Sequence, residues 1–344
     1  EVSFGDSKEY PIGRMTGIAV DDSGRIFIGD DDQLTIHAFN PGGSYIKSLG
    51  RPGEGPGEFR SLVQTMHVDS QYLYVHDPAQ QRINVFLLST LGPSHTIDLT
   101  PEQRSSVDEL KSTYPSDYYL LNDYKLLFGF VKTRKTNDLD EQTGVYERHK
   151  LYYLMGKEGK IISDKIYEQK SSTMFSFRMK GMATTFSFPF FGKVLAALNG
   201  NELFIVQSEE FLIKVYDLSG RYLRAFYYPF RKKKLMREDA IQSSFQEEVL
   251  QNIIQRIPLP DTWPALSDML IDDENRLWIA TIVEDFDIYD WWVLRETGEV
   301  ITKFEWPRDK PIKVIRNSAV YTLETNEETG LQQVVRYGFE LEER

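Results

Sequence analysis

The chain has 344 residues, of which 41% are hydrophobic and 13% aromatic, and it contains no cysteine. Its formal net charge of −12 argues against non-specific nucleic-acid binding, which depends on a basic surface. The lack of cysteine excludes disulfides, thiolate metal sites and cysteine nucleophiles. No apolar run approaches the roughly 18 residues of a membrane-spanning helix. Because the chain opens on Glu1, we expect a mature or trimmed segment of a longer product.

One pattern of short strands and turns is repeated along the chain. An apolar strand is followed by a polar turn, a second strand that ends near an acid or polar residue, and a third strand with a glycine turn. A single unit of this kind cannot bury its own apolar faces, so the repetition predicts units packed side by side. The six passages centre on Ile18–Asp30, Met66–Asp77, Tyr119–Phe130, Val194–Gln207, Leu270–Thr281 and Val314–Glu324.

The first unit shows the pattern most clearly. Residues 17–20 predict a short strand, Asp21-Asp22-Ser23-Gly24 a turn, and residues 25–30 the next strand. Alternation over residues 34–39 predicts a third strand, and a glycine turn then leads to a fourth at residues 45–49. Similar turns recur later in the chain. Asp217-Leu218-Ser219-Gly220 joins the third and fourth strands of the fourth unit, and Asp272-Asp273-Glu274-Asn275 joins the first and second strands of the fifth unit.

The repeat predicts an all-β protein, a six-bladed β-propeller of four-stranded antiparallel blades, as one domain over residues 1–344. The last unit supplies only three strands, so we expect Val2-Ser3-Phe4 to complete it and close the ring. A β-sandwich or two small β domains would not need the same turn chemistry at corresponding places. The blades are predicted at about 15–50, 62–99, 118–167, 192–230, 265–307, and 310–341 plus 2–4.

Four long segments interrupt the repeat, at residues 51–62, 100–117, 132–149 and 229–264. All four fall on connections that emerge on one face of a propeller, whereas the tight turns fall on the other. We call these the loop-decorated face and the tight-turn face. Loops on a rigid scaffold often carry function, so the loop-decorated face is the candidate working surface.

The last insertion predicts one amphipathic helix at about residues 235–257. It follows the basic run Arg231–Lys234, has apolar residues spaced by three and four, and ends before Pro258 and Pro260. We expect its apolar side to pack on the propeller. The alternatives are a docking helix for a partner or a helix on a membrane surface.

Two stretches resemble known propellers. Residues 20–30, which read Val20-Asp21-Asp22-Ser23-Gly24-Arg25-Ile26-Phe27-Ile28-Gly29-Asp30, resemble the strand–turn–strand core of NHL-type repeats. Residues 48–59, with their alternating glycines, resemble the blade connection of six-bladed β-propeller lipoproteins of Bacteroidetes. The third and sixth blades lack the terminal aspartate seen at Asp30 and Asp77. The resemblance implies a periplasmic or cell-surface location, a lipid anchor outside this chain, and a binding role.

No catalytic motif stands out. Gly50–Gly57 lacks the G-K-[ST] of a phosphate loop, so it is expected to be a stiff connection between blades. His67 and His76 lie on neighbouring strands and could approach one another, but a third ligand for a catalytic zinc is not evident. No nucleophile elbow indicates Ser-His-Asp catalysis. The remaining histidines are His37, His95 and His149.

Acidic clusters follow three of the second strands and should emerge on the loop-decorated face. Ca²⁺ takes several such oxygen ligands, and propeller lactonases of the gluconolactonase type use a metal at the axis. However, no segment has a D-x-[DN]-x-[DN]-G loop, so we expect solvated acids and no cofactor, with Ca²⁺ as the alternative. The clusters are Asp30-Asp31-Asp32, Asp138/Asp140/Glu141 and Glu284/Asp285/Asp287.

Aromatic residues near the same face suit a carbohydrate or peptide ligand, because they offer a large contact area at low entropy cost. The competing interpretation is that they belong to the core. Side chains alternate along a strand, so Trp291 and Trp292 must face opposite ways. The set is Tyr118, Tyr119, Phe190, Phe191, Tyr289, Trp291 and Trp292.

Together these features predict an exported module that binds a small molecule, glycan or protein at the axial mouth of the loop-decorated face. One alternative is a metal-dependent propeller lactonase or lyase that uses axial acids or His67 and His76. Another is a structural scaffold for a surface complex. The predicted ligand-binding residues hold equivalent places in the repeat and are Thr16, Asp30, Gln64, Asp77, Gln207 and Asp268.

Overall fold

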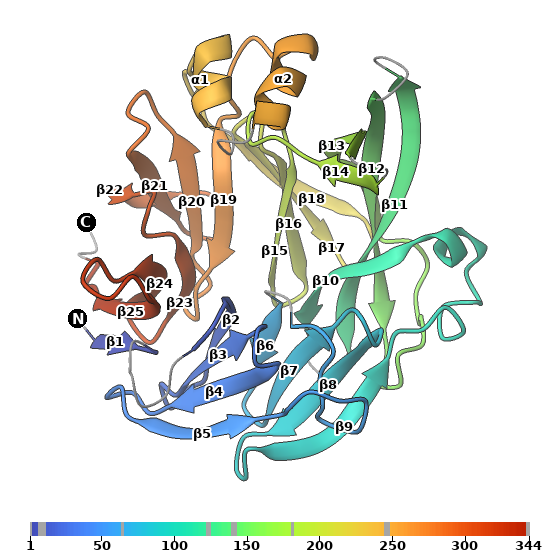
Figure 1. Ribbon diagram of the computed structural model, residues 1–344, viewed down its shortest axis with the longest axis vertical. Coiled ribbons are helices and arrows are strands. Elements are labelled where there is room, and N and C mark those ends of the chain that lie inside the picture. The colour runs from blue at the N-terminus through green and yellow to red at the C-terminus, as the bar shows by residue number, and fades with distance from the viewer. Residues whose placement is uncertain are drawn as a thin grey trace.

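The computed structural model describes residues 2–5, 12–62, 65–121, 125–138, 143–179, 182–243 and 248–341. Six antiparallel sheets surround a common centre and confirm the predicted all-β six-bladed propeller (Figure 1). Four blades have four strands each, in chain order from the inner to the outer strand. The first is β2 (Met15–Val20), β3 (Ile26–Asp30), β4 (Thr35–Phe39) and β5 (Tyr45–Leu49), and the second is β6 (Met66–Val68), β7 (Tyr72–Asp77), β8 (Arg82–Leu87) and β9 (Gly92–Asp98). The fourth is β15 (Val194–Asn199), β16 (Glu202–Gln207), β17 (Leu212–Asp217) and β18 (Tyr222–Tyr227), and the fifth is β19 (Leu266–Ile271), β20 (Leu277–Ile282), β21 (Ile288–Leu294) and β22 (Val300–Pro307).

The last blade is closed by the N-terminal strand, as predicted. It consists of β23 (Ile312–Arg316), β24 (Ala319–Thr325), β25 (Gln332–Gly338) and β1 (Val2–Phe4). β1 pairs antiparallel with β25 as the outermost strand, with Phe4 opposite Val334. One blade therefore contains both ends of the sequence, so the ring is held shut by main-chain hydrogen bonds.

The third blade departs from the prediction of four strands over residues 118–167. It has five strands, β10 (Tyr114–Leu120), β11 (Leu126–Asp138), β12 (Thr143–Met155), β13 (Tyr167–Met179) and β14 (Met182–Phe186), and the short 3₁₀ helix η1 (Asp108–Ser112) precedes it. Much of the segment expected as an insertion at 132–149 continues β11 and β12 as a hairpin beyond the blade. Residues 133–138 are exposed, so they carry no alternation of apolar and polar residues that would mark a strand.

Two helices, α1 (Arg237–Gln242) and α2 (Glu248–Arg256), take the place of the single helix predicted at 235–257. α1 ends at Gln242, and the capping residue that follows is Ser243, a residue type that favours helix caps over helix interiors. The apolar sides of both helices pack against β13 and the segment that follows β14, and Ile254 is fully buried there. This confirms that the insertion packs on the propeller, and Figure 1 shows α1 and α2 above its strands.

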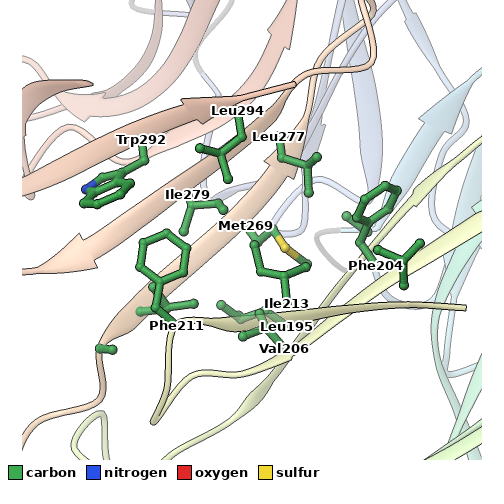
Figure 2. Close-up of a cluster of buried hydrophobic side chains, with 14 residues drawn as sticks. Leu195, Phe204, Val206, Phe211, Ile213, Met269, Leu277, Ile279, Trp292 and Leu294 are labelled. Atoms are coloured by element: carbon green, nitrogen blue, oxygen red, sulfur yellow. The ribbon is translucent and has the colours of Figure 1, made fainter. Parts of the chain in front are cut away.

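Apolar side chains fill the space between neighbouring blades. Figure 2 shows the cluster between the fourth and fifth blades, where Ile213 lies near Met269 and Phe211 lies beside Trp292. Trp292 belongs to this cluster, whereas Trp291 packs in the cluster between the fifth and sixth blades. The two tryptophans thus face opposite ways, as the strand period requires.

The tight turns repeat one hydrogen-bonded design. The carboxylates of Asp21, Asp217 and Asp272 each accept hydrogen bonds from backbone N–H groups two and four residues later and from the arginine four residues later. The residue before that arginine has positive φ, with values of 80° for Gly24 and 65° for Asn275. Glycine and asparagine tolerate this conformation best, so the similar turn chemistry has a structural cause.

Replacing Asp272 by alanine is expected to lower the free energy of unfolding by about 2 kcal/mol. Asp272 is buried, and besides the turn it accepts a 2.7 Å hydrogen bond from the Trp278 indole, which the substitution leaves unpaired. The matched control is Asp217→Ala, because that turn is exposed and has no buried indole. Chemical denaturation of both variants should show the smaller loss for Asp217→Ala, and equal losses would contradict the argument.

Because strands alternate in direction within a blade, the long connections emerge on the face opposite the tight turns. These long connections are of two kinds. One joins the second strand of a blade to the third, and the other joins the outer strand of one blade to the inner strand of the next. In the part of the chain that the structure describes, no helix has the length and apolarity to cross a bilayer.

Candidate ligand-binding site

Asp30 and Asp77 are fully buried and occupy equivalent places at the ends of β3 and β7. The Asp30 carboxylate accepts hydrogen bonds from the N–H of Gly13, at 2.8 Å, and from two N–H groups of the following turn. Asp77 accepts from the N–H of Arg60, also at 2.8 Å, and from the backbone and side chain of Gln80. Both carboxylates tie an incoming connection to their own blade, so their hydrogen-bonding capacity is committed within the fold.

The other described site residues each have a hydrogen-bond partner of their own. Thr16 donates to the carbonyl of Gly29 at 3.4 Å, Gln207 donates to the carbonyl of Lys170 at 2.6 Å, and Asp268 accepts from the N–H of Met269 at 2.9 Å. Gln64 lies outside the described residues. None of the five described residues lines a cavity reported below, and their role in ligand binding stays a prediction.

A cavity of ≈ 510 Å³ runs along the propeller axis. Its walls are the halves of the inner strands nearest the tight turns, such as residues 18–20 and 196–198. It therefore lies toward the tight-turn face, away from the predicted mouth. Its polar lining includes Asp117, whose carboxylate forms an ion pair with Lys150 at 2.9 Å and accepts from the Tyr119 hydroxyl at 3.2 Å. Burial, and then the Asp117 charge, raise the pKa of Tyr119.

His67 and His76 contact the same ring, that of Tyr118, with centroid distances of 4.7 and 6.4 Å. Tyr118 is thus a shared neighbour of both histidines, and an approach of the two histidines to each other stays a prediction. Burial lowers the pKa of each to about 4, so both are neutral near pH 7. Among the described residues, no group of three or more histidines and acids is placed to hold a metal ion.

The glycine-rich stretch is a connection between blades, as predicted. The Glu58 carboxylate accepts from the N–H of Gly55 at 2.7 Å and from Arg51 at 2.8 Å. Arg82, from the second blade, donates to the carbonyls of Gly55 and Glu58 at 2.6 and 2.9 Å. These bonds pin the stretch against the second blade.

The acidic clusters are partly engaged with their surroundings. Asp31 forms an ion pair with Arg14, and Asp138 one with Lys135. The Asp285 carboxylate accepts from the N–H of Asp287 at 2.9 Å. Asp140 and Glu141 lie outside the described residues. Calcium binding stays a prediction.

A second cavity, of ≈ 430 Å³, opens on the loop-decorated face, off the axis, between the fourth and fifth blades and beside α1. We call it the blade 4–5 pocket. Its lining comes from β13, the connection from β14 to β15, the start of β19, and the end of β20. The connection from β20 to β21, the start of β21 and the residue after β22 complete it. Leu266 and Ile282 line its inner side, and Leu266 also belongs to the core of Figure 2. Its volume falls in the range of roughly 300–1,000 Å³ that is typical of small-molecule sites.

Aromatic side chains dominate the wall of this pocket. Phe188 and Trp263 are buried, whereas Phe191, Phe286 and Tyr289 are half-buried. The Trp263 ring meets Phe286 edge-on at 5.0 Å. Tyr289 belongs to β21, and the other four rings come from three different connections that pack over the same blade interface.

Two cations also line the pocket, Lys193 and Arg308. The Arg308 guanidinium lies 4.4 Å from the ring centre of Tyr289 and 4.8 Å from that of Phe286. Its Nε donates to the carbonyl of Ile288 at 2.8 Å, which fixes the plane of the group. Burial lowers the pKa of Arg308, but an arginine remains charged at neutral pH.

Polar groups complete the lining. Six serine and threonine residues line the pocket, and the Trp263 indole nitrogen is buried without a hydrogen-bond partner in the described part of the protein. A further hollow of ≈ 510 Å³ adjoins the pocket and shares Phe191 and Trp263 with it. The six serine and threonine residues are Ser172, Thr173, Ser187, Ser208, Ser243 and Ser267.

Sequence reasoning identified part of this pocket. Phe191 and Tyr289 were in the expected aromatic set, but Trp263, Phe286 and Arg308 were not. Phe286 stands among the acids 284–287, and Trp263 and Pro264 directly precede an inner strand. An aromatic residue inside an acidic loop is the signal that could have pointed to Phe286.

Comparison with known proteins supports the fold. A sequence family described as a 6-bladed beta-propeller matches residues 6–186. The sequence matches none of the curated proteins.

Solved structures share the architecture at low sequence identity. A Bacteroides vulgatus member of the duf4221 family is 12% identical with a TM-score of 0.59, and the alignment covers 100% of this chain and 97% of that one. A Bacteroides fragilis protein that is assumed to be exported is 12% identical with a TM-score of 0.54, covering 98% and 94%. The calcium-binding regucalcin of Agrobacterium tumefaciens is 12% identical over 100% and 97%, but its TM-score of 0.42 carries no inference about calcium.

Proposed function

Since the chain belongs to the DUF5128 family of six-bladed β-propellers, we propose that it is an exported ligand-binding module whose site is the blade 4–5 pocket. The site remains on the loop-decorated face predicted from the sequence, but it lies off the axis. A shared fold with a protein that is assumed to be exported supports the export part of the proposal.

One observation carries the binding role: the blade 4–5 pocket combines five aromatic side chains with hydroxyls and two cations. Pockets that are largely apolar, with a few placed polar groups, are typical of small-ligand sites. The rings give contact area at low entropy cost, because each has only two rotatable side-chain bonds.

Calorimetric titration with neutral oligosaccharides, acidic oligosaccharides and short peptides tests the proposal. For a ligand that binds, Phe191→Ala should weaken the affinity about tenfold or more, a loss of about 1.4 kcal/mol or more. Tyr227→Ala is the matched control, because Tyr227 is an exposed aromatic of β18 outside the pocket, and it should leave the affinity unchanged. Binding that Phe191→Ala does not weaken, or no binding by any probe, would overturn this site.

A further inference from the structure

The charges of the blade 4–5 pocket differ in sign from those of the protein as a whole. The chain carries a formal net charge of −12, yet both charged side chains among the described lining residues, Lys193 and Arg308, are cations. Neither has an ion-pair partner within 4.0 Å in the described ranges of the chain. Asp285 and Asp287 are close enough to act on Arg308 through their charge, but they do not line the pocket.

Arg308 is held in a fixed orientation. Its Nε donates a hydrogen bond to the carbonyl of Ile288, and one terminal nitrogen donates to the carbonyl of Asp285 at 3.5 Å. The guanidinium lies over the rings of Tyr289 and Phe286. A guanidinium presents a planar fork of donors that matches the two oxygens of a carboxylate. Because the group is already oriented, little side-chain entropy is lost when an anion binds.

The remaining lining favours a ligand with many hydroxyl groups. A hydroxyl can both donate and accept hydrogen bonds, and six serine and threonine side chains line the pocket. Ser208 already accepts from the N–H of Lys193, and Ser243 already donates to the carbonyl of Ala240. Trp263 is 3% exposed and its indole nitrogen has no partner among the described residues, so an oxygen placed beside it would satisfy a buried donor. Aromatic rings next to such groups suit the apolar face of a sugar ring.

We propose that the blade 4–5 pocket binds an acidic saccharide, with the sugar ring against its aromatic residues and the carboxylate at Arg308. This inference rests on the proposed function and names the ligand class of the same site. The adjoining hollow, which shares Phe191 and Trp263, gives room for more than one sugar unit. An acidic peptide could pair with the same two cations, but it has fewer hydroxyl groups than a saccharide to bond with the six serine and threonine side chains.

Matched ligand pairs test the carboxylate directly. The probes are trigalacturonate, trimannuronate and a hyaluronan tetrasaccharide, each compared with its neutral methyl ester by calorimetric titration. At least one acid should bind, and its ester should bind roughly 30-fold more weakly, since a charge-assisted hydrogen bond is lost. Added salt should weaken binding of the acid but not of the ester.

Substitutions in the pocket test whether the difference in affinity between acid and ester arises at Arg308. Arg308→Gln should weaken binding of the acid roughly 30-fold and leave that of the ester little changed, while Arg308→Lys should retain part of the affinity. Lys193→Gln, on an exposed side chain, should give a smaller loss, and it remains informative if Arg308→Gln disturbs the loop that holds it. Acids and esters that bind equally, or tighter binding of an acidic peptide, would overturn the saccharide inference but leave the pocket as a binding site. Lack of binding by every probe would overturn both.

Discussion

Replacing Phe4 by alanine is expected to lower the free energy of unfolding by about 3–5 kcal/mol, the usual cost of truncating a buried phenylalanine. Phe4 is the last residue of β1 and only 1% exposed. Its ring meets that of Phe39, in the first blade, edge-on with centroids 6.1 Å apart. The substitution therefore removes contacts that join the last blade to the first, and chemical denaturation measures the loss.

Ser3→Ala is the matched control for Phe4→Ala. Ser3 lies in the same short strand but is exposed, so the change should stay within about 0.5 kcal/mol of the unmodified protein. The backbone pairing of β1 with β25 is the same in both variants. If the two variants lose the same stability, packing between the first and last blades is not what closes the ring.

The order of the blades was predictable because turns with a recognisable sequence separate the strands within several of the units. The Asp21 and Asp272 turns are specified locally, by hydrogen bonds within five residues and one position of positive φ, so they can be recognised without tertiary information. The closing strand was predictable because the last unit was one strand short. The turns could be predicted because their interactions are close in sequence. The closing strand could be predicted because counting strands in the repeat shows that one is missing.

The third blade and the site were less predictable for physical reasons. Residues 133–138 form a strand with solvent on its sides, so no buried face imposes a period of two. Trp263 and Arg308 enter one pocket from connections that are distant in sequence. Their convergence is decided by how the connections pack over the blade interface, and the repeat carries no information about this.

Acidification from pH 7 to pH 4 is expected to remove on the order of 3 kcal/mol of stability through His76 alone. Burial lowers the pKa of His76 from 6.5 to about 4. Its ring is 2% exposed, lies edge-on to Phe128 at 6.3 Å, and has no hydrogen-bond partner for either nitrogen among the described residues. Between pH 6.5 and pH 4 the unfolded chain binds a proton that the native state does not, so stability falls as the pH falls.

His76→Phe should flatten this pH dependence, because phenylalanine fits among the same aromatic rings and cannot be protonated. At pH 7 the variant should be at least as stable as the unmodified protein, since two buried nitrogens without partners are removed. A residual slope is expected from His67, whose pKa burial also lowers to about 4. His95→Gln is the control, because His95 is exposed and its removal should change the profile much less. Denaturation curves at several pH values between 7 and 4 measure the slopes, and an unchanged slope in His76→Phe would show that His76 is accessible to protons in the native state.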